Sequence, residues 1–202
     1  MHPDTMRLID RWVGIPLCFF ASFWPLKKAQ ADSNSTLATN IPPPDTIVFI
    51  LIAEIGALVV AYPAIKETRK QHPKSRICFI TAPAGLQTLE LMGFEKEDIF
   101  LLETSSIKSL LKGIVNIRSH FKGGRVSAIV LEPFTRFSTL LSAWIGASKR
   151  IGCYRFLNEG VFLGNILTHR LVYNPHLHMS QTYFALAKAL IEPDSAKPLL
   201  KE

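Results

Sequence analysis

Apolar residues follow strand-like and helix-like patterns in alternation from about residue 46 onward. Residues 46–53 (TIVFILIA) form a continuous apolar and β-branched run, which is typical of a strand buried on both faces. Residues 56–71 then have apolar side chains at helical spacing and end in a basic stretch (KETRKQ), where cations complement the helix dipole. Pro63 lies inside this span, and we expect it to kink or shorten the helix.

The alternation continues with shorter elements as far as residue 153. Strands are predicted over 76–81, 98–102, 126–131 and 150–153, and helices over 84–92, 107–121 and 137–145. Elements in this order predict a Rossmann-like α/β domain, in which a parallel sheet lies between two layers of helices. Residues 155–178 interrupt the pattern with several glycines and a proline, and we expect a loop there before a last helix over 178–191.

The first 45 residues have a different character. Residues 12–26 (WVGIPLCFFASFWPL) are almost uninterruptedly apolar and lie between Arg7 and Arg11 on one side and Lys27 and Lys28 on the other. About 15 residues are too few for a spanning helix, which needs about 20. Aromatic residues at both ends and the basic flanks favour a segment that lies in the interface of an anionic membrane.

Two other interpretations of this segment remain open. Ala29-Gln30-Ala31 resembles a signal-peptide cleavage site, although two lysines precede it where such peptides are normally uncharged. The segment is also compatible with a helix packed on the body of the protein. We divide the chain into an apolar N-terminal segment (1–31), a polar and proline-rich linker (32–45), a folded domain (46–191) and a disordered tail (192–202).

Composition narrows the choice of partners. The chain has 202 residues and a formal net charge of +7, which favours anionic partners such as phosphorylated sugars or acidic lipids. It has neither a long basic run nor an arginine–aromatic repeat, so nucleic acid is not an expected partner. Cys18, Cys78 and Cys153 are far apart and form no CxxC motif, which favours a reducing cytosol.

Ligands of open parallel sheets bind beyond the carboxyl ends of the strands, and this rule points to the residues that follow the first, second, fourth and fifth strands. The turn after the first strand reads AEIGA, so it lacks the G-x-G-x-x-G pattern of a dinucleotide site. Glu54 is the carboxylate in this turn, and one interpretation is that it acts as a general base. The alternative interpretation is that its negative charge only complements the dipole of the helix that follows. The candidates for substrate binding are Gly56, Glu132, Arg136, Arg150, Arg155, His178, Ser180 and Gln181.

The charged candidates each have a chemical reason and a structural alternative. Glu132 and Arg136 follow the fourth strand, where they can hold an acceptor or form a surface ion pair across one helical turn. Arg150 and Arg155 offer planar forks of donors for phosphate or sugar hydroxyls, or they are simple surface charges.

The last helix begins with polar residues that can touch a ligand. Ser180 and Gln181 lie in its first turn, where they can cap the helix or contact a ligand at its end. His176 and His178 suggest a metal, but no acidic or cysteine partner lies at ligand spacing. Neither a metal nor another cofactor is therefore expected, and structural hydrogen bonding is favoured for these histidines.

Several stretches of the chain carry a family resemblance. They are 47–65 (IVFILIAEIGALVVAYPAI), Arg150-Ile151-Gly152 with Tyr154 and Arg155, 167–181 (LTHRLVYNPHLHMSQ) and the leading stretch 9–19 (IDRWVGIPLCF). In this order and spacing they resemble family 9 glycosyltransferases, the ADP-heptose:lipopolysaccharide heptosyltransferases. The resemblance extends over about residues 7–191.

The resemblance implies the amino-terminal, acceptor-binding domain of a GT-B enzyme. In that architecture a second Rossmann-like domain binds the nucleotide sugar, so the donor is expected to bind only through a carboxyl-terminal domain that these 202 residues lack. Family members transfer heptose with inversion to a lipid-linked lipopolysaccharide acceptor. They work at the cytoplasmic face of the inner membrane without a required metal cluster, and a basic domain suits such an anionic acceptor.

Two positions depart from the family pattern. Heptosyltransferases typically have a Gly-Asp pair in the first turn, where the aspartate is the candidate base, but this chain has Gly56-Ala57. The basic residue common in their first strand corresponds to Leu51. One hypothesis is an acceptor-binding half that uses Glu54 as base, and the other is a catalytically degenerate or truncated homologue acting as a membrane-peripheral binding module. An unrelated flavodoxin-like or Rossmann binding domain is a third interpretation.

Overall fold

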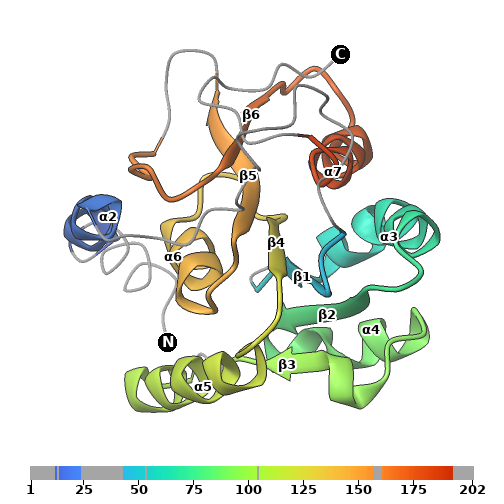
Figure 1. The fold of residues 1–202 in the computed structure, drawn as a ribbon, viewed down its shortest axis with the longest axis horizontal. Coiled ribbons are helices and arrows are strands. Elements are labelled where there is room, and N and C mark those ends of the chain that lie inside the picture. The colour runs from blue at the N-terminus through green and yellow to red at the C-terminus, as the bar shows by residue number, and fades with distance from the viewer. Residues whose placement is uncertain are drawn as a thin grey trace.

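Parallel strands form one sheet between two layers of helices (Figure 1). The computed structural model describes residues 12, 14–23, 43–52, 54–103, 105–156 and 161–192, apart from the side chains of residues 155 and 156. The strands are β1 (Thr46–Ile50), β2 (Arg76–Thr81), β3 (Ile99–Leu101), β4 (Val126–Val130), β5 (Lys149–Phe156) and β6 (His169–Tyr173). Their order across the sheet is β3-β2-β1-β4-β5-β6, and each neighbouring pair is parallel.

Strand β1 lies at the centre of the sheet and is buried on both faces. Ile47 pairs in register with Ile77 of β2 and with Ser127 of β4. Side chains alternate between the two faces, so Ile47 and Phe49 belong to one core and Val48 and Ile50 to the other. This double burial explains why the sequence of β1 is a continuous apolar run rather than an alternating one.

The helices divide into two layers. One face is covered by α3 (Ile55–Gln71), α4 (Leu86–Leu91) and α7 (Met179–Lys188), and the other by α5 (Ile107–His120) and α6 (Arg136–Trp144). Single-turn 3₁₀ helices, η1 (Pro83–Gly85) and η2 (Lys96–Asp98), precede α4 and β3. Helices α3 and α7 lie side by side on the first face, although α7 comes at the end of the domain (Figure 1). The expected Rossmann-like α/β fold is confirmed.

Helix α3 runs without interruption through Pro63 as far as Gln71. The expectation that Pro63 shortens the helix is therefore wrong. A proline inside a helix costs about 3 kcal/mol or more because it removes one backbone hydrogen bond and crowds the preceding turn. Pro63 itself is exposed, whereas Ala61 before it and Ala64 after it are buried in the core, and their packing holds the helix on both sides of the proline.

Strand β6 was missed by the sequence pattern, which predicted a loop over 155–178. Its sequence (HRLVY) begins with two basic side chains and therefore lacks the continuous apolar run that indicates a buried strand. His169 is nevertheless fully buried, with Nδ1 2.9 Å from Thr168 Oγ1 and Nε2 3.0 Å from the carbonyl oxygen of Glu192. β5 is also longer than predicted, and it pairs with β6 through an irregularity between Cys153 and Arg155.

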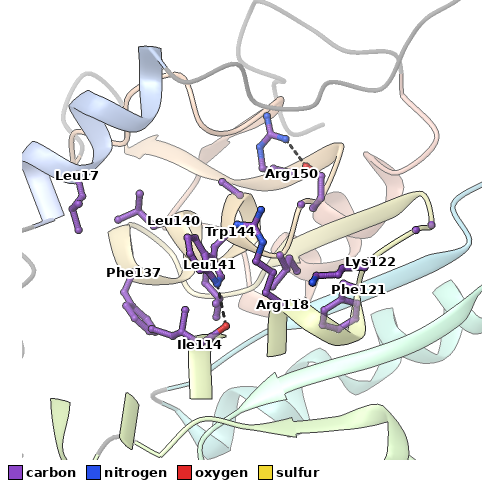
Figure 2. A pocket seen from close by; sticks show the side chains of 16 residues that line it. Leu17, Ile114, Arg118, Phe121, Lys122, Phe137, Leu140, Leu141, Trp144 and Arg150 are labelled. Atoms are coloured by element: carbon purple, nitrogen blue, oxygen red, sulfur yellow. Dashed lines mark hydrogen bonds between the residues drawn. The ribbon is translucent and has the colours of Figure 1, made fainter. Parts of the chain in front are cut away.

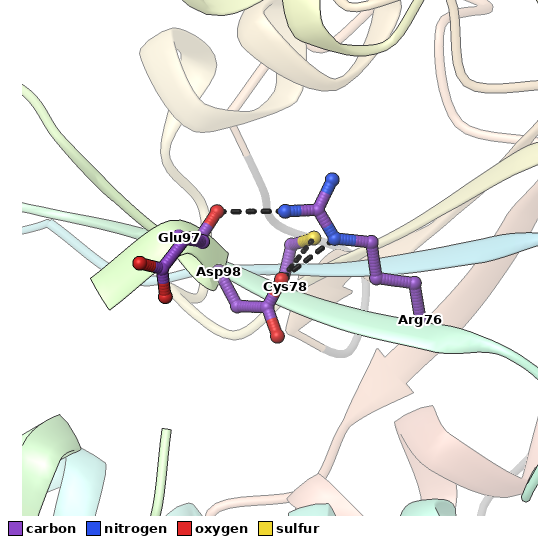
Figure 3. A network of polar contacts seen from close by, with 4 residues as sticks. All are labelled: Arg76, Cys78, Glu97 and Asp98. Atoms are coloured by element: carbon purple, nitrogen blue, oxygen red, sulfur yellow. Dashed lines mark hydrogen bonds and ion pairs between the residues drawn. The ribbon is translucent and has the colours of Figure 1, made fainter. Parts of the chain in front are cut away.

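A polar network ties β2 to the start of β3 (Figure 3). The guanidinium group of Arg76 donates to Asp98 Oδ1 at 2.6 Å and to the carbonyl oxygen of Glu97 at 2.7 Å. The thiol of Cys78, which is buried, lies 3.9 Å from the same Asp98 oxygen. The network therefore anchors the edge strand at its amino end.

The apolar amino-terminal segment contains helix α2 (Gly14–Phe23), which packs beside α6. Among the described residues no helix has both the length and the apolar character needed to cross a membrane. Residues 32–42 of the predicted linker (32–45) and residues 193–202 of the predicted tail (192–202) lie outside the described residues.

Candidate functional site

The centre of the candidate site is the point where the chain reverses direction across the sheet. From β1 the chain proceeds outward to β2 and β3, then returns to β4 and continues in the opposite direction to β5 and β6. In open parallel sheets the carboxyl ends of the two strands at this switch point are the general location of ligand sites. Glu54 follows β1, and Glu132 and Arg136 follow β4, so the structure places these sequence candidates at one edge.

Glu132 connects the two loops at the switch point. Its Oε1 accepts a hydrogen bond from the backbone N–H of Ile52 at 2.7 Å, and its Oε2 accepts one from the hydroxyl of Ser138 in α6. Only 7% of the residue is exposed. A buried carboxylate whose two oxygens are both engaged in this way holds the turn after β1 in place, so Glu132 is a positioning residue rather than a free base.

Glu54 is the opposite kind of carboxylate. It occupies the N-cap position of α3 in an extended backbone conformation, but its side chain makes no capping hydrogen bond. The residue is exposed, and the described part of the structure shows no hydrogen bond or ion pair for it. A solvent-accessible carboxylate with free oxygens at the switch point is able to accept a proton from a bound hydroxyl group.

The first turn of α3 leaves room for a ligand. Gly56 lies in this turn, and a methyl group built on its Cα would meet no other atom within 4 Å. Backbone N–H groups at a helix amino terminus have no partner within the helix, and the helix dipole makes this end favourable for anions. The open surface above Gly56 is therefore suited to a phosphate or a hydroxyl-rich ligand lying against the backbone.

Tyr183 is a buried residue of α7, the helix that packs against α3. Burial raises the pKa of its phenol to about 12, and the negative charge of Glu54 contributes to the rise, with smaller contributions from Cys153, Glu132 and Tyr173. Tyr183 therefore stays protonated at neutral pH and keeps its hydroxyl as a neutral group beside the two carboxylates.

Sequence reasoning missed an aromatic pair at this edge. Phe134, two residues after Glu132, has a backbone φ of 60°, a left-handed conformation that is uncommon for a bulky residue. Its ring packs edge-to-face on Tyr173 at the end of β6, with 5.6 Å between the ring centroids. Left-handed bulky residues gather at functional sites, but no residue type in the sequence signals one. The half-buried pair offers an apolar wall beside the switch point.

The start of α7 is organised by His178. His178 is the N-cap residue, and its Nδ1 accepts a hydrogen bond from the backbone N–H of Ser180 at 3.3 Å. The hydroxyl group of Ser180 lies 2.7 Å from the same nitrogen, while Gln181 is exposed in the first turn. The structure thus gives His178 and Ser180 a capping role, and a ligand contact by any of the three residues stays a prediction.

Arg150 does not belong to the candidate site. It lies at the amino end of β5, at the sheet edge opposite Glu54, and is only 1% exposed. Its guanidinium group donates to the carbonyl oxygens of Ile166, Ala147 and Ser148. The surface-charge interpretation of Arg150 is wrong, because the residue is buried, and its contact with a substrate stays a prediction. Its rigid fork of donors instead anchors the segment that precedes β6.

The other two arginines have different outcomes. Arg136 begins α6 at the carboxyl edge, and its Nε donates to the carbonyl oxygen of Phe162 at 3.2 Å. Arg155 lies inside β5, where its backbone pairs with Val172, but its side chain lies outside the described part of the structure. Contacts of Arg136 and Arg155 with a substrate therefore stay predictions.

The fold has known counterparts. Neither a family model nor a curated protein matches the sequence. Among solved structures, a family 9 glycosyl transferase from Veillonella parvula matches with a TM-score of 0.56 and 19% identity, over 78% of this chain and 45% of that one. The Escherichia coli heptosyltransferase WaaC with ADP matches with a TM-score of 0.55 and 8% identity, over 75% of this chain and 49% of that one.

This chain has the fold of part of a family 9 glycosyltransferase. It spans less than half the length of either structure. The sequence resemblance points to the same family as the structural likeness. The structural matches cover three quarters or more of this chain.

Proposed function

We propose that this chain is the acceptor-binding half of a glycosyltransferase that transfers heptose from ADP-heptose to a lipopolysaccharide core acceptor. The observation that carries the proposal is the free carboxylate of Glu54 at the switch point of a fold shared with family 9 structures. The donor binds to a second domain outside these residues, so this half contributes the acceptor surface and the base.

The reaction follows from the chemistry of Glu54. An acceptor hydroxyl group attacks the anomeric carbon of the heptose and forms the new glycosidic bond. The bond between that carbon and the diphosphate oxygen breaks, and ADP leaves with the electron pair. The proton of the attacking hydroxyl moves to the Glu54 carboxylate, and general-base assistance of this kind contributes about 10²- to 10⁴-fold in rate.

The neighbouring residues support this role of Glu54. Glu132 anchors the backbone N–H of Ile52, two residues before Glu54, and so supports the start of the turn after β1. The open surface at Gly56 lets the acceptor approach the helix backbone. The net charge of +7 favours an anionic, phosphorylated acceptor of the lipopolysaccharide core type.

A second candidate function is a catalytically degenerate binding module. Ala57 stands where family members typically have the aspartate base, and it is partly buried against the core. Leu51, at the position of their common basic residue, is 2% exposed and packs in the same core. At both positions an apolar side chain that packs in the core replaces a polar residue of the family pattern. This difference favours a chain that binds the acceptor without catalysing transfer.

One experiment separates the two candidates. The protein expressed from its whole coding region is incubated with ADP-heptose and a heptose-free lipopolysaccharide acceptor, and transfer and acceptor affinity are measured in parallel. The glycosyltransferase proposal expects transfer by the wild type and a loss of kcat of about 100-fold or more for Glu54→Gln, with acceptor affinity unchanged.

A matched control is Glu95→Gln, because Glu95 is an equally exposed carboxylate at the opposite edge of the sheet. It should leave both kcat and acceptor affinity unchanged. Acceptor binding without transfer would establish the binding module. Equal kcat values for Glu54→Gln and the wild type would remove Glu54 as the base.

A further inference from the structure

Helix α2 is apolar on every side, yet most of it is exposed. Its sequence (GIPLCFFASF) has no charged residue, and only Gly14 and Cys18 are buried. Phe20 and Phe23 are 69% and 74% exposed. A helix that is apolar all round normally lies inside a protein or in a membrane, and a cluster of exposed large apolar side chains marks an interaction site.

One side of α2 is held against the rest of the domain by hydrogen bonds, so its other side faces away from the domain. Ser22 Oγ accepts a hydrogen bond from the backbone N–H of Asn165 at 3.0 Å and donates to the carbonyl oxygen of Cys18 at 2.7 Å. The close fit at Gly164 leaves no space for a side chain between this loop and α2. The exposed phenylalanines therefore point away from the domain as a fixed surface.

A groove between α5 and α6 continues this surface (Figure 2). It has a volume of about 780 Å³, and Leu17 of α2 lines it together with Trp144 of α6 and with Arg118 and Lys122. Trp144 is held in place by a hydrogen bond from Nε1 to the carbonyl oxygen of Ile114 at 3.0 Å, and the Arg118 guanidinium lies 4.5 Å from its ring centre. Exposed aromatic and basic groups are thus adjacent in one groove.

Basic side chains outnumber acidic ones on this side of the molecule, where Asp45 forms an ion pair with Arg125. Between Glu103 and Glu132 the sequence has no acidic residue, and α2 and α6 have none either. The same stretch carries the basic residues Lys108, Lys112, Arg118, Lys122 and Arg125. On the opposite face of the sheet, α3 and α4 mix acidic and basic side chains, so the asymmetry is specific to the side formed by α2, α5 and α6.

We propose that α2 and the groove between α5 and α6, together called the α2 face, dock onto an anionic lipid bilayer. The phenylalanines of α2 enter the boundary between headgroups and acyl chains, while Arg118 and Lys122 contact lipid phosphates beside Trp144. At 10 residues, α2 spans only about 15 Å and lies in the interface rather than across the bilayer.

The arrangement fits a bilayer better than a second copy of the chain. A twofold contact between two α2 faces would bring Arg118 and Lys122 of one copy against the same cations of the other. A bilayer satisfies both halves of the surface at once, since it supplies apolar volume for α2 and phosphates for the cations. The inference stands apart from the proposed transfer, because lipid binding requires neither donor nor acceptor.

Vesicle co-sedimentation of the full chain tests the proposal. The chain should bind mixed phosphatidylglycerol–phosphatidylcholine vesicles and bind pure phosphatidylcholine at least tenfold more weakly. Arg118→Gln with Lys122→Gln should weaken binding by about fivefold for each charge removed. Phe20→Ser with Phe23→Ser should weaken it at least tenfold, and the helical circular dichroism of both variants should match that of the wild type because all four positions are exposed.

Matched controls come from the other face of the sheet. Lys66→Gln with Lys188→Gln removes the same charge from α3 and α7, and Leu91→Ser removes an apolar side chain that is 90% exposed on α4. Neither should change vesicle affinity by more than twofold. Equal losses in the control and α2-face variants would overturn the proposal. So would a dimer, detected by light scattering without lipid, that the Phe20→Ser and Phe23→Ser pair abolishes.

Discussion

The carboxylate of Glu132 accepts a hydrogen bond from the backbone N–H of Ile52 at 2.7 Å, across 80 residues of sequence. This bond joins the loops that follow the two central strands, β1 and β4, at the point where the sheet changes direction. The other oxygen of Glu132 accepts from Ser138, so the same side chain also fixes the start of α6. The geometry of the candidate site therefore depends on a buried residue that need not touch the ligand.

Replacing Glu132 should destabilise the fold as well as the site. Glu132→Ala leaves the half-buried N–H of Ile52 and the buried hydroxyl of Ser138 without this acceptor, and unsatisfied buried groups cost about 1–3 kcal/mol. Urea unfolding should show a lower midpoint with an unchanged slope. Glu54→Ala serves as the control, because Glu54 is exposed and its loss should change the free energy of unfolding by less than about 0.5 kcal/mol.

Two glycines with different surroundings give a paired prediction. A Cβ at Gly85 would lie 2.6 Å from Thr81 Oγ1 and 3.2 Å from Leu58 Cδ1. Gly85→Ala should therefore lower the free energy of unfolding by about 1–3 kcal/mol, as overpacking of a filled core does. Gly56→Ala has open space around it and lies in a helix, so it should be neutral or stabilise by up to about 1 kcal/mol. Thermal unfolding of both variants measures the difference.

The three cysteines should resist modification in the native protein. Cys18, Cys78 and Cys153 are all buried. Burial raises the pKa of the Cys78 thiol to about 12, the Asp98 carboxylate raises it further, and Arg76 partly opposes both effects. A thiol-specific reagent at pH 8 should label none of them within minutes and all three after denaturation. Rapid labelling of the folded chain would contradict this packing.

His72 should make stability depend on pH. It ends α3, and its Nε2 is buried without a hydrogen-bond partner. Burial lowers the pKa of the imidazole below its ordinary value of 6.5, and repulsion from the Lys149 ammonium lowers it further. Lys149 is held nearby by hydrogen bonds to the carbonyl oxygens of Leu190 and Glu192, each of 2.6 Å.

The sign follows from the direction of this shift. Because the folded protein binds the proton of His72 less tightly than the unfolded chain, the stabilisation is present above pH 6.5 and is lost as the pH falls through the lowered pKa. Urea unfolding at pH 7.5 and pH 5 should show a smaller loss for His72→Gln than for the wild type. An identical pH dependence in both proteins would show that His72 stays solvated.

The sequence predicted those residues of the candidate site whose location follows from their position at the end of a strand. Glu54 and Glu132 were found because the residues after parallel strands gather at one edge. The rule did not select Arg150, which was a candidate because of its fork of donors; β5 starts at Lys149, so Arg150 lies at the opposite edge. Phe134 gave no signal, because its left-handed backbone is imposed by the loop after β4 and by packing on Tyr173.

The sequence by itself determined the alternation of strands and helices, because burial on both faces requires continuous apolar runs and amphipathic helices show a 3.6-residue period. It also determined the apolar character of 14–23 and the one-sided charge between Glu103 and Glu132. Only the tertiary structure decided that β6 completes the sheet, that Glu132 is buried while Glu54 is free, and that α2 lies beside a basic groove. Those features arise from contacts between distant segments, whose partners no local pattern specifies.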